Sequence, residues 1–182
     1  MAATRRYQLD SSSALTRVGQ FVSTLTHRHT EEIDERIRAL LNDDAQWRLV
    51  ARLPAFDRAH HLSVHDLLES RGFNDPDLLR AALLHDVGKS DGVHHVRLWH
   101  RVGRVIGRRS TPAIWGSISR RPATLRTGLY LAEHHARLGA DAARASGVSE
   151  RCYELILGHE VSPPTGDRLL DALIEADGAE IR

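Results

Sequence analysis

Apolar residues recur at helical spacing along most of the chain, whereas runs of β-branched residues, which favour strands, are absent. Glycine, proline, asparagine and aspartate interrupt this pattern and divide it into segments. The pattern predicts helices over residues 14–25, 33–41, 47–51, 54–71, 76–85, 94–109, 129–146, 150–159 and 168–177, and a further short helix that starts at Thr111-Pro112. We therefore expect an all-α protein, and its 182 residues are most simply a single domain with a substantial core.

The segment over residues 76–85 is predicted to be a deeply buried helix. Asp75 can cap it, Pro76 suits its first turn, and its side chains are apolar on nearly all sides except at Arg80. It runs into the sequence His85-Asp86-Val87-Gly88-Lys89. Ionisable groups are costly to bury unless they are paired or bind a metal. Taken alone, the His-Asp pair is more typical of a packed histidine beside a salt-bridged aspartate than of a metal site.

Charge and cysteine content bear on the possible partners and the cellular location of the protein. The formal net charge is +1, so bulk charge indicates no class of partner. The basic residues are 24 arginines and one lysine, Lys89. Lysine supplies a compact point charge, so a lone lysine favours a place opposite a phosphate, unless it reflects chance in an arginine-rich composition. The single cysteine, Cys152, excludes an intrachain disulfide, and with no signal peptide or membrane span in the sequence we expect a cytoplasmic protein.

Further ionisable residues fall on the predicted apolar faces of separate helices. His60, His135, His159 and Asp177 each share a face with apolar neighbours, so each is expected to point inward. Together with the His-Asp pair they make four histidines and two aspartates directed at one helical interior. Mutual hydrogen bonds cannot easily satisfy so many groups, whereas one or two metal ions can. This set of residues predicts a metal site.

The order of these residues resembles that of the HD superfamily of metal-dependent phosphohydrolases. The resemblance covers about residues 54–180. It rests on Asp57-x-x-His60-x-x-x-Val64, Leu84-His85-Asp86-Val87-Gly88-Lys89, His135-x-x-x-Gly139, Leu157-Gly158-His159-Glu160 and Ile174-Glu175-Ala176-Asp177. It implies an HD-type helical bundle over residues 54–182, preceded by an N-terminal tail and helices over residues 1–53.

The resemblance also implies a ligand set. The metal ligands would be His60, His85, Asp86 and Asp177, while His135 and His159 match the additional histidines that let some members hold a second ion bridged by Asp86. His61 could replace His60 and His134 could replace His135, but the spacing to Val64 and Gly139 favours the first of each pair. No Gly-Tyr-Pro sequence occurs, so the cyclic-dinucleotide phosphodiesterase branch with that signature is not expected, and we expect no second domain of the kind found in the alarmone hydrolases.

The expected activity is hydrolysis of a phosphate ester or anhydride, with a small phosphorylated substrate and, by family, a nucleotide. Asp86 would bind or bridge the ions, and Lys89 would hold a phosphate oxygen. If only one ion binds, His135 and His159 could orient the phosphate or protonate the leaving group. The mixed nitrogen and oxygen donors suit Mn, Fe, Co, Ni or Zn better than Mg alone.

Two other classes of function stay open. A few proteins with HD-like scaffolds are two-iron oxygenases, and a metal-stabilised regulatory or polyanion-binding module would need no catalysis. The second alternative draws on the Arg-rich segment over residues 97–126, in a stretch without acidic residues from Gly92 to Ala132. That segment could meet nucleic acid, a polyphosphate or an anionic membrane. We favour a solvated outer face for it.

Overall fold

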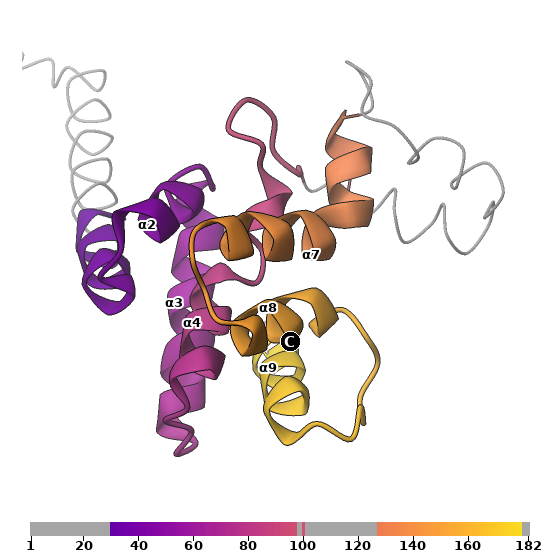
Figure 1. The fold of residues 1–182 in the computed structure, drawn as a ribbon. Coiled ribbons are helices and arrows are strands. Elements are labelled where there is room, and N and C mark those ends of the chain that lie inside the picture. Colours follow the sequence, from indigo (N-terminus) through magenta and orange to yellow (C-terminus); the bar gives the residue numbers. More distant parts are fainter. Residues whose placement is uncertain (1–29, 98–99, 101–126, 180–182) are drawn as a thin grey trace, which may run out of the picture.

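The structure is a computed structural model of the chain and describes residues 30–97, 100 and 127–179. Figure 1 shows these residues as a group of short helices connected by loops. The predicted helix over residues 14–25 and nearly all of the Arg-rich segment lie outside the described residues.

The described chain is all-α, as predicted. Residues 30–41 are helical. They are followed by α2 (Asp44–Val50), α3 (Ala55–Ser70), α4 (Pro76–Leu84), the short 3₁₀ helix η1 (Val87–Lys89), α7 (Thr127–Ala145), α8 (Glu150–Gly158) and α9 (Arg168–Ala179). Strands are absent from the described ranges, where the one isolated bridge joins Ser90 and His95. None of the helices in the described ranges has the length and hydropathy needed to cross a membrane.

Local signals in the sequence set most helix ends. Asp75 accepts hydrogen bonds from two backbone amides at the start of α4, and Pro76 occupies its first turn. Ser149 caps α8 by accepting from the amide of Cys152. At the end of α3, Gly72 takes a positive φ of 84°, which glycine adopts without the steric penalty of other residues. These predicted caps are confirmed.

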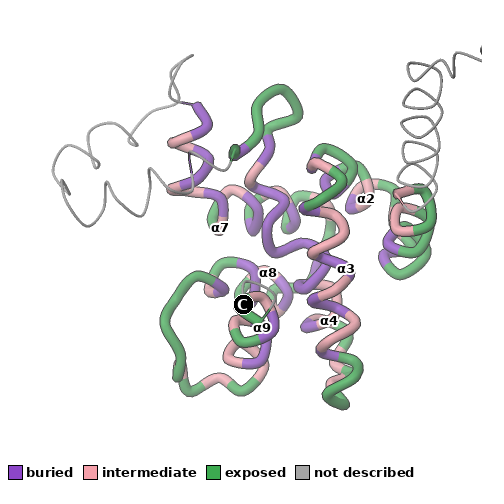
Figure 2. The backbone as a smooth tube through the Cα atoms, turned by 180° about the vertical axis from the view of Figure 1, so that it is seen from behind, coloured by how far each residue is buried: buried purple, intermediate pink, exposed green. Residues whose placement is uncertain are grey.

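Helix α4 lies in the middle of the fold and packs against α2, α3, α8 and α9, while α7 packs against η1 and α8. Its residues Leu78, Ala81, Ala82, Leu83 and Leu84 are buried, as Figure 2 shows by the purple stretch at α4. Residues Ile37 and Leu41 of the first described helix and Val50 of α2 join the same hydrophobic core. The division of the chain at residues 53 and 54 stays a prediction.

The buried face of α3 is rotated about the helix axis relative to the predicted one, so that prediction is wrong. Phe56, expected on that face, is 76% exposed, whereas His61 and His65 are buried, and His65 had been expected to point away. His61 is buried because its Nδ1 donates to the carbonyl oxygen of Leu83 at 2.8 Å, and His65 Nδ1 lies 3.2 Å from the carboxylate of Asp66. Such polar partners let histidines enter a core that hydrophobic pattern alone assigns to other residues.

Two further expectations need correction. In α9 the buried residues are Ala172, Leu173 and Ala176, so Asp177 lies at the edge of the core face, with its side chain 28% exposed, rather than at its centre. Residues 94–97 do not start a helix, because they form a loop that folds back on η1. The amide of Val96 donates to the carbonyl oxygen of Lys89, and Asp91 accepts from the amides of Val93 and His94.

Candidate metal centre

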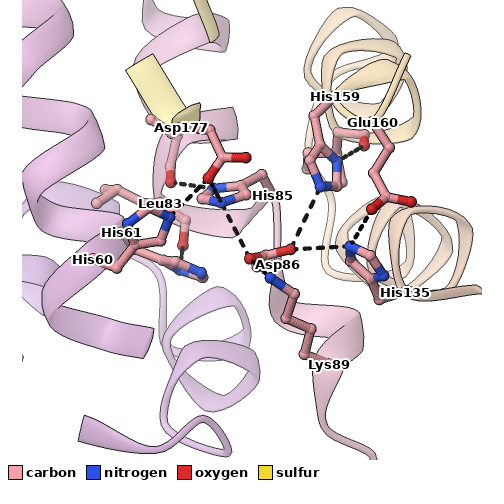
Figure 3. A network of polar contacts seen from close by, with 12 residues as sticks. His60, His61, Leu83, His85, Asp86, Lys89, His135, His159, Glu160 and Asp177 are labelled. Carbon is pink, nitrogen blue, oxygen red and sulfur yellow. Dashed lines mark hydrogen bonds and ion pairs between the residues drawn. The ribbon is translucent and has the colours of Figure 1, made fainter. Parts of the chain in front are cut away.

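The six residues predicted to hold metal converge from five elements on one point of the fold (Figure 3). Helix α3 carries His60, α7 carries His135 and α9 carries Asp177. His85 and His159 each occupy the C-terminal cap of their helix, α4 and α8 respectively, and Asp86 follows His85. The buried α4 therefore places the His-Asp pair between α3 and α9 on one side and α7 and α8 on the other.

Three of the histidines are oriented in the same way. The Nδ1 atom lies within hydrogen-bond distance of the carbonyl oxygen three residues earlier: 2.9 Å from Ala82 for His85, 3.0 Å from Ala132 for His135 and 2.7 Å from Ile156 for His159. A carbonyl oxygen only accepts, so each Nδ1 carries the hydrogen. In the neutral ring Nε2 then carries the lone pair, and this is the usual arrangement of metal-binding histidines.

Asp86 stands between two groups of ligands. Its Oδ2 lies 3.4 Å from His85 Nε2, and its Oδ1 lies 3.3 Å from His135 Nε2 and 3.4 Å from His159 Nε2. One carboxylate thus offers one oxygen to each side. The first group is His60, His85, Asp86 and Asp177, and the second is Asp86, His135 and His159.

The exposed edge of the first group is formed by His60 and Asp177. His60 Nε2 lies 2.8 Å from Asp177 Oδ1, and His85 Nε2 lies 3.3 Å from the same oxygen. The side chains of His60 and Asp177 are 16% and 28% exposed, while His85 and Asp86 are almost fully buried. The group therefore has an inner pair closed off from solvent and an outer pair that a ligand can reach.

The spacing of the donor atoms fits bound ions. Ligands about 2.1 Å from one ion lie about 3.0–3.4 Å from each other in octahedral or tetrahedral geometry. The distances of 3.3–3.4 Å around Asp86 agree with this. In addition, His85 Nε2 and Asp86 Oδ1 are buried and have no hydrogen-bond partner in the described part of the chain. A buried polar atom without a partner costs about 1–3 kcal/mol, and a cation would offset that cost at both atoms.

The electrostatics of the centre favour a positive charge. Burial alone would lower the pKa of His85, but the carboxylates of Asp86 and Asp177 outweigh it and raise the pKa to about 10. Burial alone would raise the pKa of Asp86, yet the Lys89 ammonium and His85 hold it well below its usual range. The pKa of Asp177 is likewise lowered, by His60 and His85 against the effect of burial. Without metal, nearby cationic groups such as His85 and the Lys89 ammonium stabilise the ionised carboxylates, and a divalent ion would supply that positive charge in their place.

Lys89, predicted as a catalytic residue, lies beside the centre. It ends η1, and its Nζ contacts Asp86 Oδ2. Its side chain is 16% exposed, so the ammonium is partly open to solvent beside the centre. The chain therefore places its single lysine against the carboxylate that both ligand groups share.

The neighbouring histidines occupy different environments. His134 lies away from the ligand groups, with its ring 4.7 Å from that of Tyr130. His61 is fully buried behind the centre, its ring 4.6 Å from that of His85, and its Nε2 has no hydrogen-bond partner among the described residues. Burial and the nearby charge of His85 lower the pKa of His61 well below its usual value. His61 is thus a neutral packing partner of the ligand His85.

Sequence reasoning assigned no role to Glu160, although it adjoins His159. Its Oε1 lies 3.3 Å from His135 Nε2. A third cluster of possible ligands, His65, Asp66 and Glu69, lies elsewhere on α3. There Arg36 already donates two hydrogen bonds to the Asp66 carboxylate, at 2.7 and 2.8 Å.

Comparison with known proteins identifies no relative of the chain. No family model, no curated protein and no solved structure matches the chain. The assignment of a chemistry therefore depends on the residues of the centre. The structure itself shows a largely buried set of histidines and carboxylates that could hold metal.

Proposed function

We propose that the chain is a metal-dependent phosphohydrolase of the HD type, which hydrolyses a phosphate ester or anhydride of a small molecule, with nucleotides as the expected substrates. The observation that carries the proposal is the position of Asp86. Each of its oxygens faces a different ligand group, as a carboxylate that bridges two ions must. The donors are imidazoles and carboxylates, which suit Mn, Fe, Co, Ni or Zn.

The protein residues divide the work as follows. His60, His85, Asp86 and Asp177 would hold one ion, and Asp86, His135 and His159 would hold the other. Ions bound there would lower the pKa of a coordinated water and supply the nucleophile. The backbone carbonyls that accept from Nδ1 of His85, His135 and His159 keep the three rings aligned, so little reorganisation is needed when the site is loaded.

Lys89 supports a phosphate substrate over an uncharged one. Its ammonium lies within reach of the bridging carboxylate and is partly exposed. When ions occupy the ligand groups, Asp86 no longer needs this counter-charge. The ammonium is then available to a non-bridging phosphate oxygen, where it would offset the charge that develops in the transition state.

The proposal is tested by loading the purified protein with each of the five metals and assaying a panel of nucleotides and phosphomonoesters for phosphate release. Chromatography of the products then shows which bond is cleaved. We expect one or two equivalents of metal by elemental analysis, and hydrolysis that Asp86→Asn abolishes. Folded protein that takes up no metal would reject the centre itself. Metal-loaded protein that hydrolyses no member of the panel faster than Asp86→Asn would reject the hydrolase.

A further inference from the structure

Glu160 contacts a ligand of the centre, although neither ligand group found among the described residues includes it. It follows His159 in the turn after α8. Its side chain is 28% exposed and its Oε1 lies 3.3 Å from His135 Nε2 (Figure 3). The same nitrogen lies 3.3 Å from Asp86 Oδ1. Glu160 and Asp86 thus approach one ligand atom from two directions.

The position of the hydrogen on the His135 ring indicates what could bind between His135 and the two carboxylates. Its Nδ1 donates to the carbonyl oxygen of Ala132, so the neutral ring presents a lone pair at Nε2. That lone pair faces two carboxylate oxygens, and three acceptors around one point repel each other unless a cation lies among them. A proton on Nε2 can satisfy part of this set. A metal ion would satisfy all of it, together with His159, whose Nε2 lies 3.4 Å from Asp86 Oδ1, once the Glu160 side chain turns further toward Asp86 and His159, whose donor atoms group with that of His135 without it.

When Glu160 is included, both ligand groups contain two imidazoles and two carboxylates. The first group has two imidazoles and two carboxylates, of which Asp86 is buried and Asp177 is 28% exposed. The second group has two imidazoles and the shared Asp86. Glu160 would add the missing outer carboxylate, with the same exposed fraction as Asp177. Its distance from His135 Nε2 is that of two adjacent ligands on one ion, about 3.0–3.4 Å.

We infer that Glu160 is the fourth protein ligand of the second ion, completing the set formed by Asp86, His135 and His159. This inference rests on the proposed two-metal centre. The added negative charge lies on the open side of the second group, where it would raise the affinity for a divalent ion. It also predicts that the two ions differ in retention when Glu160 is changed, because the first group does not use this residue.

The competing explanation is structural. Glu160 would then only pair with a protonated His135 and would leave the centre when metal displaces that proton. The two explanations differ in what happens to metal, since a structural ion pair contributes nothing to a loaded site. Activity alone would not separate them, so the measurement must be of the metal.

The experiment uses the full chain with Glu160→Gln, which keeps the size of the side chain but removes its charge, and Glu160→Ala. Glu175→Gln is the matched control, because Glu175 is an exposed carboxylate on α9 two residues from Asp177. Each protein is loaded with Co²⁺ and titrated with a competing chelator, while bound metal is counted by elemental analysis and the visible absorption of Co²⁺ reports its coordination. Circular dichroism confirms that each variant is folded.

We expect the unaltered protein and Glu175→Gln to bind two ions. Glu160→Gln and Glu160→Ala should keep one ion with unchanged affinity and hold the other at least tenfold more weakly, with a changed Co²⁺ spectrum. Two ions of unchanged affinity and spectrum in Glu160→Gln would overturn the inference and leave the two-metal centre standing. A single ion in the unaltered protein at saturating Co²⁺ would also overturn it, and no ion at all would reject the centre as a whole.

Discussion

Gly88 packs directly against the backbone of α7 at His135. A Cβ atom at Gly88 would overlap the carbonyl oxygen of His135 and would lie 2.5 Å from the amide nitrogen of Gly139. Because backbone atoms cannot turn aside as a flexible side chain can, only glycine lets η1 approach α7 this closely. This contact sets the distance between Asp86, two residues before Gly88, and the imidazole of His135. The second ligand group therefore depends on a residue that binds nothing itself.

We expect Gly88→Ala to move Asp86 away from His135 and so to disrupt the second ligand group. The added methyl group must push η1 and α7 apart, which should weaken metal binding by the second group and destabilise the protein by about 1–3 kcal/mol. Metal content and urea-induced unfolding measure the two effects. Gly178→Ala is the control, because Gly178 adjoins Asp177 in α9 and a Cβ there meets no atom within 4 Å. Equal metal content and stability in both variants would show that the close packing does not hold the centre together.

Helix positions were predictable because the signals that end helices are local. The Asp75-Pro76 start of α4 and the serine cap of α8 depend on residues adjacent in sequence, and both are present. The loop over residues 94–97 was missed because its contacts join it to Lys89 and Ser90. A basic amphipathic pattern is compatible with a helix there, and only the tertiary contacts decide against it.

Side-chain orientation was harder to predict than helix position. On α3 the hydrophobic pattern placed Phe56 inward and His65 outward, and the reverse is found. The pattern cannot anticipate that a carbonyl oxygen of α4 accepts from His61, because that partner is distant in sequence. His60 nevertheless reaches the centre, since its ligand group extends to the partly exposed edge of the core. The role inferred for Glu160 had no signal in periodicity, and its adjacency to His159 was the only hint.

The two neighbouring histidines of α3 should differ in what their loss affects. His60→Ala removes a partly exposed residue of the first ligand group, so metal content should fall while the fold is retained. His61→Ala leaves a cavity in the core and should cost about 2–4 kcal/mol of unfolding free energy, with metal retained by the folded fraction. Elemental analysis and thermal unfolding of both variants check this. His134→Ala, on α7, should change neither strongly, and the prediction fails if His61→Ala loses more metal than His60→Ala.

The metal-free protein should be most stable near pH 6.5. Burial lowers the pKa of His61, so the unfolded chain takes up a proton there as the pH falls below 6.5, and stability falls with it. The pKa of His85 is raised to about 10, so the folded protein keeps a proton that the unfolded chain loses above pH 6.5. Stability should therefore also fall as the pH rises toward 10, by at most about 1.4 kcal/mol per pH unit for this one proton.

Urea unfolding of chelator-treated protein between pH 5 and pH 9 measures this dependence. Saturating metal should abolish the decline on the alkaline side, because the ion replaces the proton at His85 and its ligands bind more tightly once deprotonated. Stability of the metal-free protein that stays level or rises between pH 7 and pH 9 would contradict the charge assigned to His85.

The last prediction concerns Lys89, because it separates a hydrolase from a metal-stabilised module. Its Nζ contacts Asp86 Oδ2, an atom that an ion would need, so the ammonium competes with metal in the free protein. Lys89→Ala should therefore bind metal at least as tightly as the unaltered protein. If Lys89 holds the phosphate that is being transferred, the same change should reduce turnover about a hundredfold, the size expected for one lost electrostatic contact.

Lys89→Arg should restore only part of the activity, because the guanidinium is larger and directs its donors differently. Both variants are measured for metal affinity and for turnover of whichever phosphate compound the panel identifies. A fall in turnover that follows a fall in metal content would assign Lys89 to the stability of the centre. Tight metal binding with lost turnover requires a role for the ammonium at the substrate, because nothing else at the centre has then changed.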